Sequence, residues 1–450
     1  PQRCSQDICC RKLVTLEVLI RREGCVLNQL IMSSILGFFK RNYAAFISPP
    51  TPRNADDSSA TSPPLKFGIL GAAAIAPAAL IIPAKSHPEV ELYAVAARDI
   101  SRAERFAKKH GIKKWYGGQD SYQSKPDYNG RDRDILHIYC AMTELLDDPA
   151  IDVVYNPLPN GLHYEWTMKA LAAGKHVLLE KPSGDTAEET RRMFSLADQK
   201  GLVLLEAFHY RFHPAIRRVK AIIDSGELGP IKEVNATLAV PKGILDSVND
   251  IRMNYDLGGG AMMDCGCYPL SCVRYVASSN PSAVTSATAV RYPKDPRIDI
   301  GTTADLTFPS STPGGAPVRS TVKCTMSNSP RFGFIPKPEI NVRAVCENGS
   351  IELFNFVMPV IYHYITVKPD GGIPRTEKAY VFKGDGGKGE EWWTTYRHQL
   401  EAFVDKVKGR TPQTWMSAED SIANMEWIEK IYEESGLGSR PQSTYVLPTL

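Results

Sequence analysis

Short apolar runs separated by amphipathic segments fill the chain from Leu65 to about residue 205. Runs this short, bounded by polar or glycine-containing turns, are typical of buried strands, while apolar residues three and four apart predict helices. The predicted strands are 65–70, 90–97, 151–155, 176–179 and 202–205, and the predicted helices are 101–110, 164–173 and 187–200. Strands that alternate with helices predict an α/β, doubly wound parallel sheet, so we assign residues 65–210 to a Rossmann domain.

Beyond Arg211 the pattern changes from alternation to consecutive strands. After a helix at 215–225, strands are predicted at 231–240, 283–292, 300–308, 318–326, 339–354, 360–368 and 378–382, and helices at 390–408 and 417–434. Strands that follow one another without helices between them indicate a mainly antiparallel sheet. Residues 211–450 are therefore predicted to form an α+β domain with an open sheet.

Residues 1–64 are predicted to be an N-terminal extension and linker. Residues 1–31 show no clear period, and we interpret Met32 as the native start and the preceding residues as translated upstream sequence. A mitochondrial presequence is the alternative, although the segment carries acidic residues. Apolar residues at helical spacing (Ile35, Phe39, Tyr43 and Phe46) predict a short amphipathic helix that docks on the body. The proline-rich stretch 48–64 is typical of a linker.

Composition narrows the class of protein. Net charge is +3, and residues 65–450 balance 45 basic against 45 acidic side chains, which argues against nucleic acid as the main partner. The ten cysteines form no paired C-x-x-C motifs, so neither a zinc site nor a disulfide framework is predicted, and we expect no metal. No apolar run approaches the roughly 20 residues that span a bilayer. These features favour a cytoplasmic enzyme with reduced thiols.

A glycine turn follows the first predicted strand. Gly71-x-Ala73-x-Ile75-Ala76 keeps only the first glycine of G-x-G-x-x-G, so alone it is a weak dinucleotide signal or a plain strand-to-helix turn. At the end of the second strand, Ala96-Ala97 precede Arg98 where an NAD enzyme usually has a carboxylate. A guanidinium pairs with a 2′-phosphate, so NADP is favoured over NAD. The alternative is that Arg98 is a solvated surface charge.

Three further segments carry candidate chemistry at predicted strand ends or helix starts. Asn156-Pro157-Leu158-Pro159-Asn160-Gly161-Leu162-His163 and Glu180-Lys181-Pro182 follow predicted strands, at the edge where doubly wound sheets bind ligands. The glycine run 258–260 precedes Asp264 and Tyr268, whose spacing of four puts carboxylate and phenol on one helical face. Alone, each segment is also compatible with a loop or with a tyrosine that merely packs.

Taken in order, these motifs resemble the glucose–fructose oxidoreductase/inositol dehydrogenase family, and within it the dimeric dihydrodiol dehydrogenases and fungal NADP-dependent D-xylose dehydrogenases. The similarity runs from Met32 to the end and includes segment 206–214. It implies that the second domain binds substrate and forms a homodimer, and that Lys181 and Tyr268 are catalytic with Asp264 in support. It implies cofactor contacts at Gly71, Ala73, Ile75, Ala76, Arg98, Pro157, Leu158, Asn160, His163, Glu180 and Lys181. Residues 124–143 depart from the family pattern, and we interpret them as an atypical insert, such as a retained intron.

The resemblance predicts oxidation of a sugar or cyclic alcohol, with Tyr268 as general base. A phenol of pKa about 10 is only ~0.1% ionised at pH 7. A cation at hydrogen-bonding distance lowers a pKa by roughly 1–3, and Lys181 is the expected cation. Oxidation of D-xylose at C1 to D-xylonolactone is the first hypothesis, and a trans-dihydrodiol or other cyclic-alcohol dehydrogenase is the second. A catalytically silent dinucleotide-sensing regulator is the third, and His209 or His163 is the alternative base.

Overall fold

The structure is a computed structural model that describes residues 35–51, 62–118, 141–245, 247, 250–328, 338–383 and 387–448. Residues 1–31 and most of the predicted insert, 124–140, lie outside the described residues. The last three residues of that insert begin a helix at 141–147, in which Ala141 and Met142 are buried. Within the described ranges, every helix is too short or too polar to cross a membrane.

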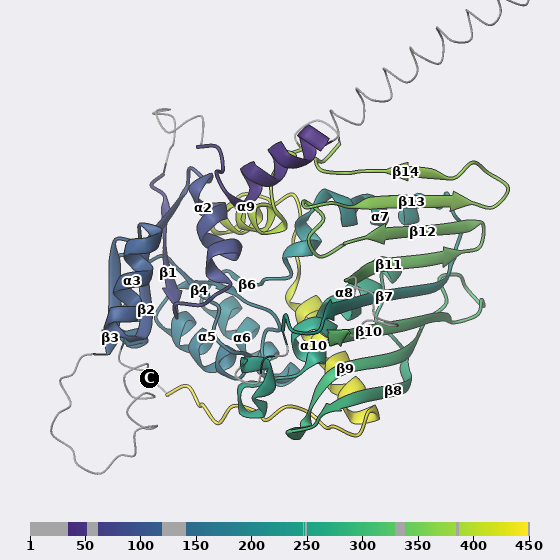
Figure 1. Cartoon of the computed structure of the whole chain (residues 1–450). Coiled ribbons are helices and arrows are strands. Elements are labelled where there is room, and N and C mark those ends of the chain that lie inside the picture. Colours follow the sequence, from purple (N-terminus) through teal and green to yellow (C-terminus); the bar gives the residue numbers. More distant parts are fainter. Residues whose placement is uncertain are drawn as a thin grey trace, which may run out of the picture.

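Six parallel strands form the first sheet, in the order β3-β2-β1-β4-β5-β6, as predicted for a Rossmann fold. The strands are β1 (Leu65–Leu70), β2 (Val90–Asp99), β3 (Lys114–Gly118), β4 (Val153–Asn156), β5 (His176–Leu179) and β6 (Leu204–Glu206). Only β3 was not predicted as a strand. Because all six run in the same direction, the segments that follow β1, β4 and β5 meet at one edge of the sheet (Figure 1).

Alternate side chains of these strands enter two separate cores, which is why the strands are apolar on both faces. Leu70, Val154 and Leu179 pack with Trp166 of α5 (His163–Ala172) and with α6 (Ala187–Gln199). Phe67 and its neighbours on the other face pack against α2 (Ile82–Lys85) and α9 (Thr395–Val407). A further helix, α3 (Ile100–His110), packs on β2 and β3, and the helix at 141–147 adds Leu145 to the first of these cores. Helices therefore cover both faces of the sheet.

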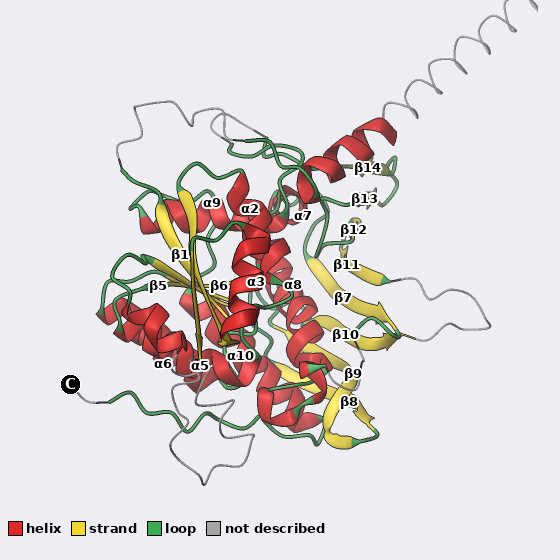
Figure 2. Cartoon of the chain, turned by 60° about the vertical axis from the view of Figure 1, so that its left-hand side comes forward, coloured by secondary structure: helices red, strands yellow, loops and turns green. Residues whose placement is uncertain are grey.

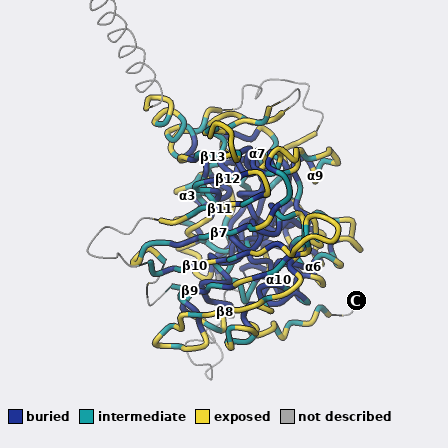
Figure 3. Tube along the Cα trace, turned by 90° about the vertical axis from the view of Figure 1, so that its right-hand side faces the viewer, coloured by how far each residue is buried: buried dark blue, intermediate teal, exposed yellow. Residues whose placement is uncertain are grey.

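The second sheet has eight strands in the order β14-β13-β12-β11-β7-β10-β9-β8. Their bounds are β7 (Ile231–Pro241), β8 (Ala283–Tyr292), β9 (Asp295–Phe308), β10 (Val318–Asn328), β11 (Glu339–Cys346), β12 (Gly349–Phe354), β13 (Tyr364–Pro369) and β14 (Arg375–Glu377). All neighbours are antiparallel except β7 and β10. Three helices, α7 (Pro214–Asp224), α8 (Cys267–Ala277) and α10 (Ala418–Glu434), lie on one face, and the other face is open (Figures 2 and 3).

Two predictions for this sheet were wrong in detail. The apolar run 339–354 divides into β11 and β12, because Glu347 and Asn348 form the two-residue loop of a tight hairpin in which Cys346 pairs with Gly349. Residues 378–382 were predicted to be a strand, but residues 378–383 form none, and the edge strand β14 ends before them. The backbone of this segment bonds to a side chain instead of to a neighbouring strand, since the Ala379 N–H donates to His363 Nε2 at 2.9 Å.

The N-terminal helix, residues 35–46, docks on the body beside this segment (purple in Figure 1). Arg41 stacks on the Tyr380 ring, with 3.8 Å between its Cζ and the ring centroid, and its Nε donates to the Val360 carbonyl at 3.1 Å. The prediction of the inward face was wrong, because Ile35, Phe39 and Tyr43 are exposed. The guanidinium of Arg41 and the amide of Asn42, which donates to the Ile361 carbonyl at 3.3 Å, make the polar contacts of this helix with the body.

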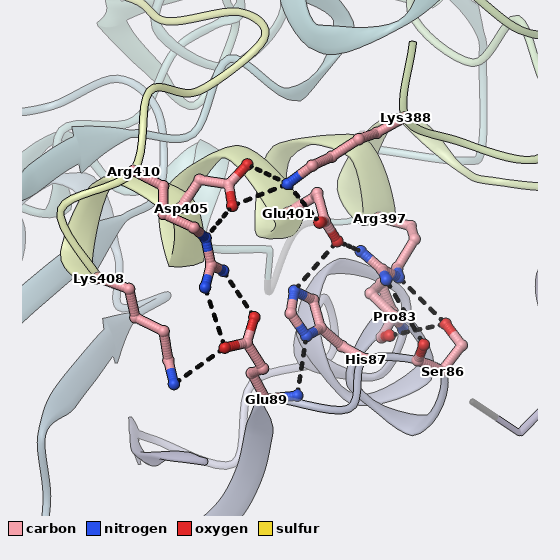
Figure 4. A network of polar contacts seen from close by, with 10 residues as sticks. All are labelled: Pro83, Ser86, His87, Glu89, Lys388, Arg397, Glu401, Asp405, Lys408 and Arg410. Atoms are coloured by element: carbon pink, nitrogen blue, oxygen red, sulfur yellow. Dashed lines mark hydrogen bonds and ion pairs between the residues drawn. The ribbon is translucent and has the colours of Figure 1, made fainter. Parts of the chain in front are cut away.

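A network of charged side chains fixes α9 against the Rossmann domain (Figure 4). At its centre, Glu401 receives a hydrogen bond from Arg397 at 2.8 Å, and its carboxylate lies 3.2 Å from His87 Nε2 of the α2–β2 loop. Arg410 extends the network by bridging Asp405 of α9 and Glu89. The N-terminal end of α9 therefore has a fixed position, and it carries Thr395 and Tyr396 toward the candidate site.

Candidate active site

The glycine turn lies at the carboxyl end of β1, at the centre of the sheet edge. Gly71 has a φ of +84°, a conformation that glycine adopts without steric cost, and its N–H donates to the Ala96 carbonyl of β2. Ala73 is partly exposed and Ile75 is 40% exposed, whereas Ala76 is fully buried in the core. Backbone near Gly71 and Ala73 is thus open to a ligand, and Ala76 serves the packing of the turn.

Positively charged side chains at the end of β2 favour the binding of an anion. Arg98 is exposed there, and the neighbouring Asp99 is occupied as the cap of α3, where it accepts from the Ser101 N–H at 2.7 Å. Arg102, which the sequence reasoning missed, donates to the Ala72 carbonyl at 3.1 Å and so lies over the glycine turn. Its spacing of four from Arg98 was the available signal. One guanidinium therefore lies over the turn, and a second, on the exposed Arg98, stands at the end of the neighbouring strand.

The segment after β4 links the two halves of the chain. Asn160 donates from its amide to the Gly258 carbonyl at 3.0 Å, and Pro157 and Leu158 lie between that contact and β4. His163 is 1% exposed, with its ring nitrogens 2.7 Å from the carbonyl oxygens of Leu158 and Pro182. Burial lowers the pKa of His163 to about 4. The structure gives this side chain main-chain partners, and its contact with a cofactor remains a prediction.

Lys181 and Asp264, whose side chains are 11% and 17% exposed, form a largely buried ion pair at the end of β5. The ammonium donates to the Asp264 carboxylate at 2.8 Å and to its main-chain carbonyl at 2.9 Å. Arg252 donates to the other carboxylate oxygen, a contact that no local pattern in the sequence predicts. Burial would raise the pKa of Asp264, but the charges of Lys181 and Arg252 outweigh it and hold that pKa well below its usual range. The site therefore contains a carboxylate and a lysine that both stay charged.

Glu180, next to the lysine, faces the interior. It is 7% exposed, accepts a hydrogen bond from the Tyr155 hydroxyl at 2.8 Å, and has its pKa raised by burial. Because the Glu180 carboxylate is bonded to Tyr155, its predicted contact with a cofactor stays a prediction.

Tyr268 joins the pair through its ring, which corrects the predicted geometry. Lys181 Nζ lies 5.0 Å from the ring centroid and gives its hydrogen bonds to Asp264, while the phenol oxygen lies 2.9 Å from His209 Nε2. Burial raises the pKa of Tyr268 well above its ordinary value, and electrostatic interactions with Tyr396 and Glu180 raise it further. The expectation that Lys181 lowers this pKa is wrong for this arrangement, because the lysine is committed to its carboxylate. Tyr268 is a neutral phenol here.

The glycine run places Asp264 and Tyr268 by a close approach of backbones. Gly260 has a φ of +141°, and a Cβ at Gly259 would lie 2.5 Å from the Arg252 carbonyl oxygen. Arg440, from the C-terminal segment, donates to the Gly259 carbonyl and pairs with Asp299. The next residues form a single π-helical turn, Met262–Gly266, that leads into α8. Asp264 on this turn and Tyr268 on α8 consequently both face Lys181.

Comparison with known proteins agrees with this arrangement. A family model described as an oxidoreductase family with an NAD-binding Rossmann fold (GFO/IDH/MocA) matches residues 65–208, and the GFO/IDH/MocA C-terminal domain matches residues 216–352. D-xylose 1-dehydrogenase (NADP(+)) 2 from Haloferax volcanii is 32% identical over 380 residues, which are 83% of this chain and 98% of that protein. Trans-1,2-dihydrobenzene-1,2-diol dehydrogenase from Sus scrofa is 31% identical over 254 residues, 56% of this chain and 66% of that protein.

A solved structure shares the fold. The 3-ketoreductase from Actinomadura kijaniata, crystallised with NADP and TDP-benzene, has a TM-score of 0.64 and 24% identity, covering 82% of this chain and 98% of that one. Both family models fit in order, the predicted Rossmann and open-sheet halves are present, and a relative matches over nearly its whole length. The chain therefore belongs to the GFO/IDH/MocA family of oxidoreductases.

Proposed function

We propose that this protein is an NADP-dependent dehydrogenase that oxidises D-xylose at C1 to D-xylonolactone. The observation that carries the proposal is the buried cluster of Lys181, Asp264 and Tyr268 at the carboxyl edge of the parallel sheet. The D-xylose 1-dehydrogenase relative, matched over 98% of its length, supports the choice of substrate.

The residues at the end of β2 fit NADP. Arg98 and Arg102 supply two guanidinium groups, and the adjacent carboxylate, Asp99, is engaged as a helix cap. Backbone at Gly71 and Ala73 is accessible for the diphosphate. When bound, NADP⁺ supplies the hydride acceptor, C4 of its nicotinamide.

The chain's own residues handle the proton and the charge on oxygen. The substrate hydroxyl donates to the Tyr268 oxygen, which receives the substrate proton as the carbonyl forms and as the phenol gives up the proton that it already carries. Lys181 stays cationic, because the charge of Asp264 outweighs burial and raises the pKa of that lysine. A fixed cation beside the phenol stabilises negative charge that develops on the substrate oxygen. Asp264 and Arg252 hold that cation in place.

A cyclic-alcohol substrate is the second candidate. The trans-1,2-dihydrobenzene-1,2-diol dehydrogenase from Sus scrofa is 31% identical over 254 residues, and the same three side chains would serve a dihydrodiol. A silent dinucleotide sensor is disfavoured by the presence of a buried lysine, carboxylate and phenol in contact, an arrangement that mere binding does not require.

The test is reduction of NADP⁺ followed at 340 nm with a panel of pentoses, hexoses, cyclitols and dihydrodiols. D-xylose is expected to give the highest kcat/KM, and a dihydrodiol that exceeds it would select the second candidate. Tyr268→Phe and Lys181→Met should each lower kcat by about 10²–10⁴-fold with little change in NADP⁺ affinity. The exposed Tyr362→Phe is the matched control. Retention of more than half the activity by Tyr268→Phe would contradict the proposal.

A further inference from the structure

His209 connects the phenol of Tyr268 to a second helix. Its side chain begins the helical turn His209–Phe212 and is 1% exposed. Nε2 lies 2.9 Å from the Tyr268 hydroxyl, and Nδ1 lies 2.8 Å from Oγ1 of Thr395, at the start of α9. The imidazole also stacks on the Tyr396 ring, with 4.0 Å between centroids and 33° between planes. Three elements thus fix its position and both of its nitrogens.

The hydrogen-bond directions follow from the end of this chain of contacts. The Thr395 hydroxyl lies 3.9 Å from the sulfur of Met358, and when it donates to that sulfur its oxygen can accept from Nδ1–H of His209. In a neutral imidazole with a proton on Nδ1, Nε2 carries a lone pair. Burial, and next the charge of Lys181, lowers the pKa of His209 to about 3, so the ring is neutral in the absence of ligands. In this tautomer the Tyr268 hydroxyl is the donor to Nε2.

This direction matters for the proton of the substrate. A phenol that already donates to Nε2 presents its oxygen lone pairs to a substrate hydroxyl. It cannot keep a second proton, however, unless its own proton leaves. Nε2 of His209 lies at hydrogen-bonding distance and can accept that proton. Lys181 cannot, because it is already protonated and donates to Asp264.

We propose that His209 is the second proton carrier: as the substrate proton moves to the Tyr268 oxygen, the phenolic proton moves to His209 Nε2. The inference rests on the proposed function, with a nicotinamide dinucleotide as the oxidant. The C–H bonding pair leaves as hydride to that oxidant, the C=O bond forms, and two protons shift by one place each. The resulting imidazolium donates from Nδ1 to Thr395 and lies against the Tyr396 ring, which favours a cation. The oxidant loses one positive charge as His209 gains one, so the total charge of the site is unchanged.

Two variants separate proton transfer from positioning. His209→Gln keeps a hydrogen-bond acceptor near Nε2 but cannot carry a proton, and His209→Leu removes both functions. We expect both to lower kcat by about 10–100-fold, with unchanged NADP⁺ dissociation constants and thermal midpoints within a few degrees of the wild type. His209→Gln within threefold of the wild-type kcat would overturn the proposal. The partly exposed His110, replaced by Gln, is the control for histidine loss.

Two further measurements do not depend on comparing variants. In mixtures of H₂O and D₂O, the wild-type kcat should fall along a curve when it is plotted against the deuterium fraction of the solvent, because two protons move in the same step. His209→Gln should give a straight line, because only one proton moves. A straight line for the wild type would overturn the proposal. In the cofactor-free protein, ¹⁵N NMR should show His209 as the neutral Nδ1–H tautomer, and an Nε2–H tautomer would also overturn it. Activity in Tyr268→Phe would instead remove the proposed function itself.

Discussion

At the scale of single residues, we expect the guanidinium groups beyond β2 to decide which dinucleotide the protein prefers. Arg98→Asp exchanges an attraction to a 2′-phosphate for a repulsion, while Asp99 still caps α3 and preserves the fold. The KM for NADP⁺ should rise by about 100-fold or more, since the change removes one charge-assisted contact and adds a like charge, and the KM for NAD⁺ should change much less. Steady-state kinetics with both cofactors test this. Equal changes in the two KM values would remove Arg98 from the cofactor site.

Glu206, at the end of β6, makes stability depend on pH. It is 1% exposed, burial raises its pKa from 4.5 to about 8, and it accepts from the Ser183 N–H at 2.7 Å. Between roughly pH 4.5 and 8 the folded state holds a proton that the unfolded chain has released, so the free energy of unfolding falls as pH rises.

The neutral isostere Glu206→Gln should remove this contribution. Urea titrations at pH 5 and pH 8 should show the variant losing less stability than the wild type across that interval, and it should be the more stable protein at pH 8. The exposed Glu144→Gln is the control and should keep the wild-type dependence. Parallel pH dependences for wild type and Glu206→Gln would show that Glu206 is not the responsible group.

At the scale of elements, the position of α9 depends on Glu401. Its carboxylate faces Arg397 of its own helix, His87 of the α2–β2 loop and Lys388 of the preceding loop (Figure 4). Glu401→Gln leaves the buried Arg397 without its counter-charge and should lower the free energy of unfolding by about 3 kcal/mol. Because α9 carries Thr395 and Tyr396, kcat should fall as well.

Chemical denaturation and steady-state kinetics check both effects. Glu433→Gln, on the exposed face of α10, is the matched control and should lie within about 0.5 kcal/mol of the wild type. A loss below 1 kcal/mol in Glu401→Gln would mean that apolar packing, such as Phe403 against Phe67, positions α9 without the charged network.

At the scale of the whole molecule, the open face of the eight-stranded sheet is where we expect a second copy to dock. Sheets of this size are normally covered on both faces or partnered, and the helices α7, α8 and α10 cover only the inner one (Figures 2 and 3). Thr237 lies on the central strand β7 between Lys323 and Asn341, outside the core.

Thr237→Arg adds a bulky charge at the centre of that face, beside Lys323. It should convert a dimer into monomers in light scattering coupled to size exclusion, because like charges brought together across a two-fold interface repel. Ser195→Arg, on the exposed side of α6, should leave the mass unchanged. A wild-type protein that is monomeric at micromolar concentration, or a Thr237→Arg variant that stays dimeric, would exclude this face.

The amino-acid sequence predicted most strands and helices in their order, although it missed the short strands β3 and β14, because hydrophobic periodicity reports local burial and a buried parallel strand is apolar on both faces. It also determined which residues follow β1, β4 and β5, and sheet direction then placed them at one edge. Partners distant along the chain were decided only by the tertiary structure. Lys181 meets Asp264 across 83 residues and Tyr268 meets His209 across 59, and no local pattern encodes which donor faces which acceptor. For the same reason the docked face of helix 35–46 was mispredicted, since Arg41 finds its aromatic partner, Tyr380, only after the chain has folded back.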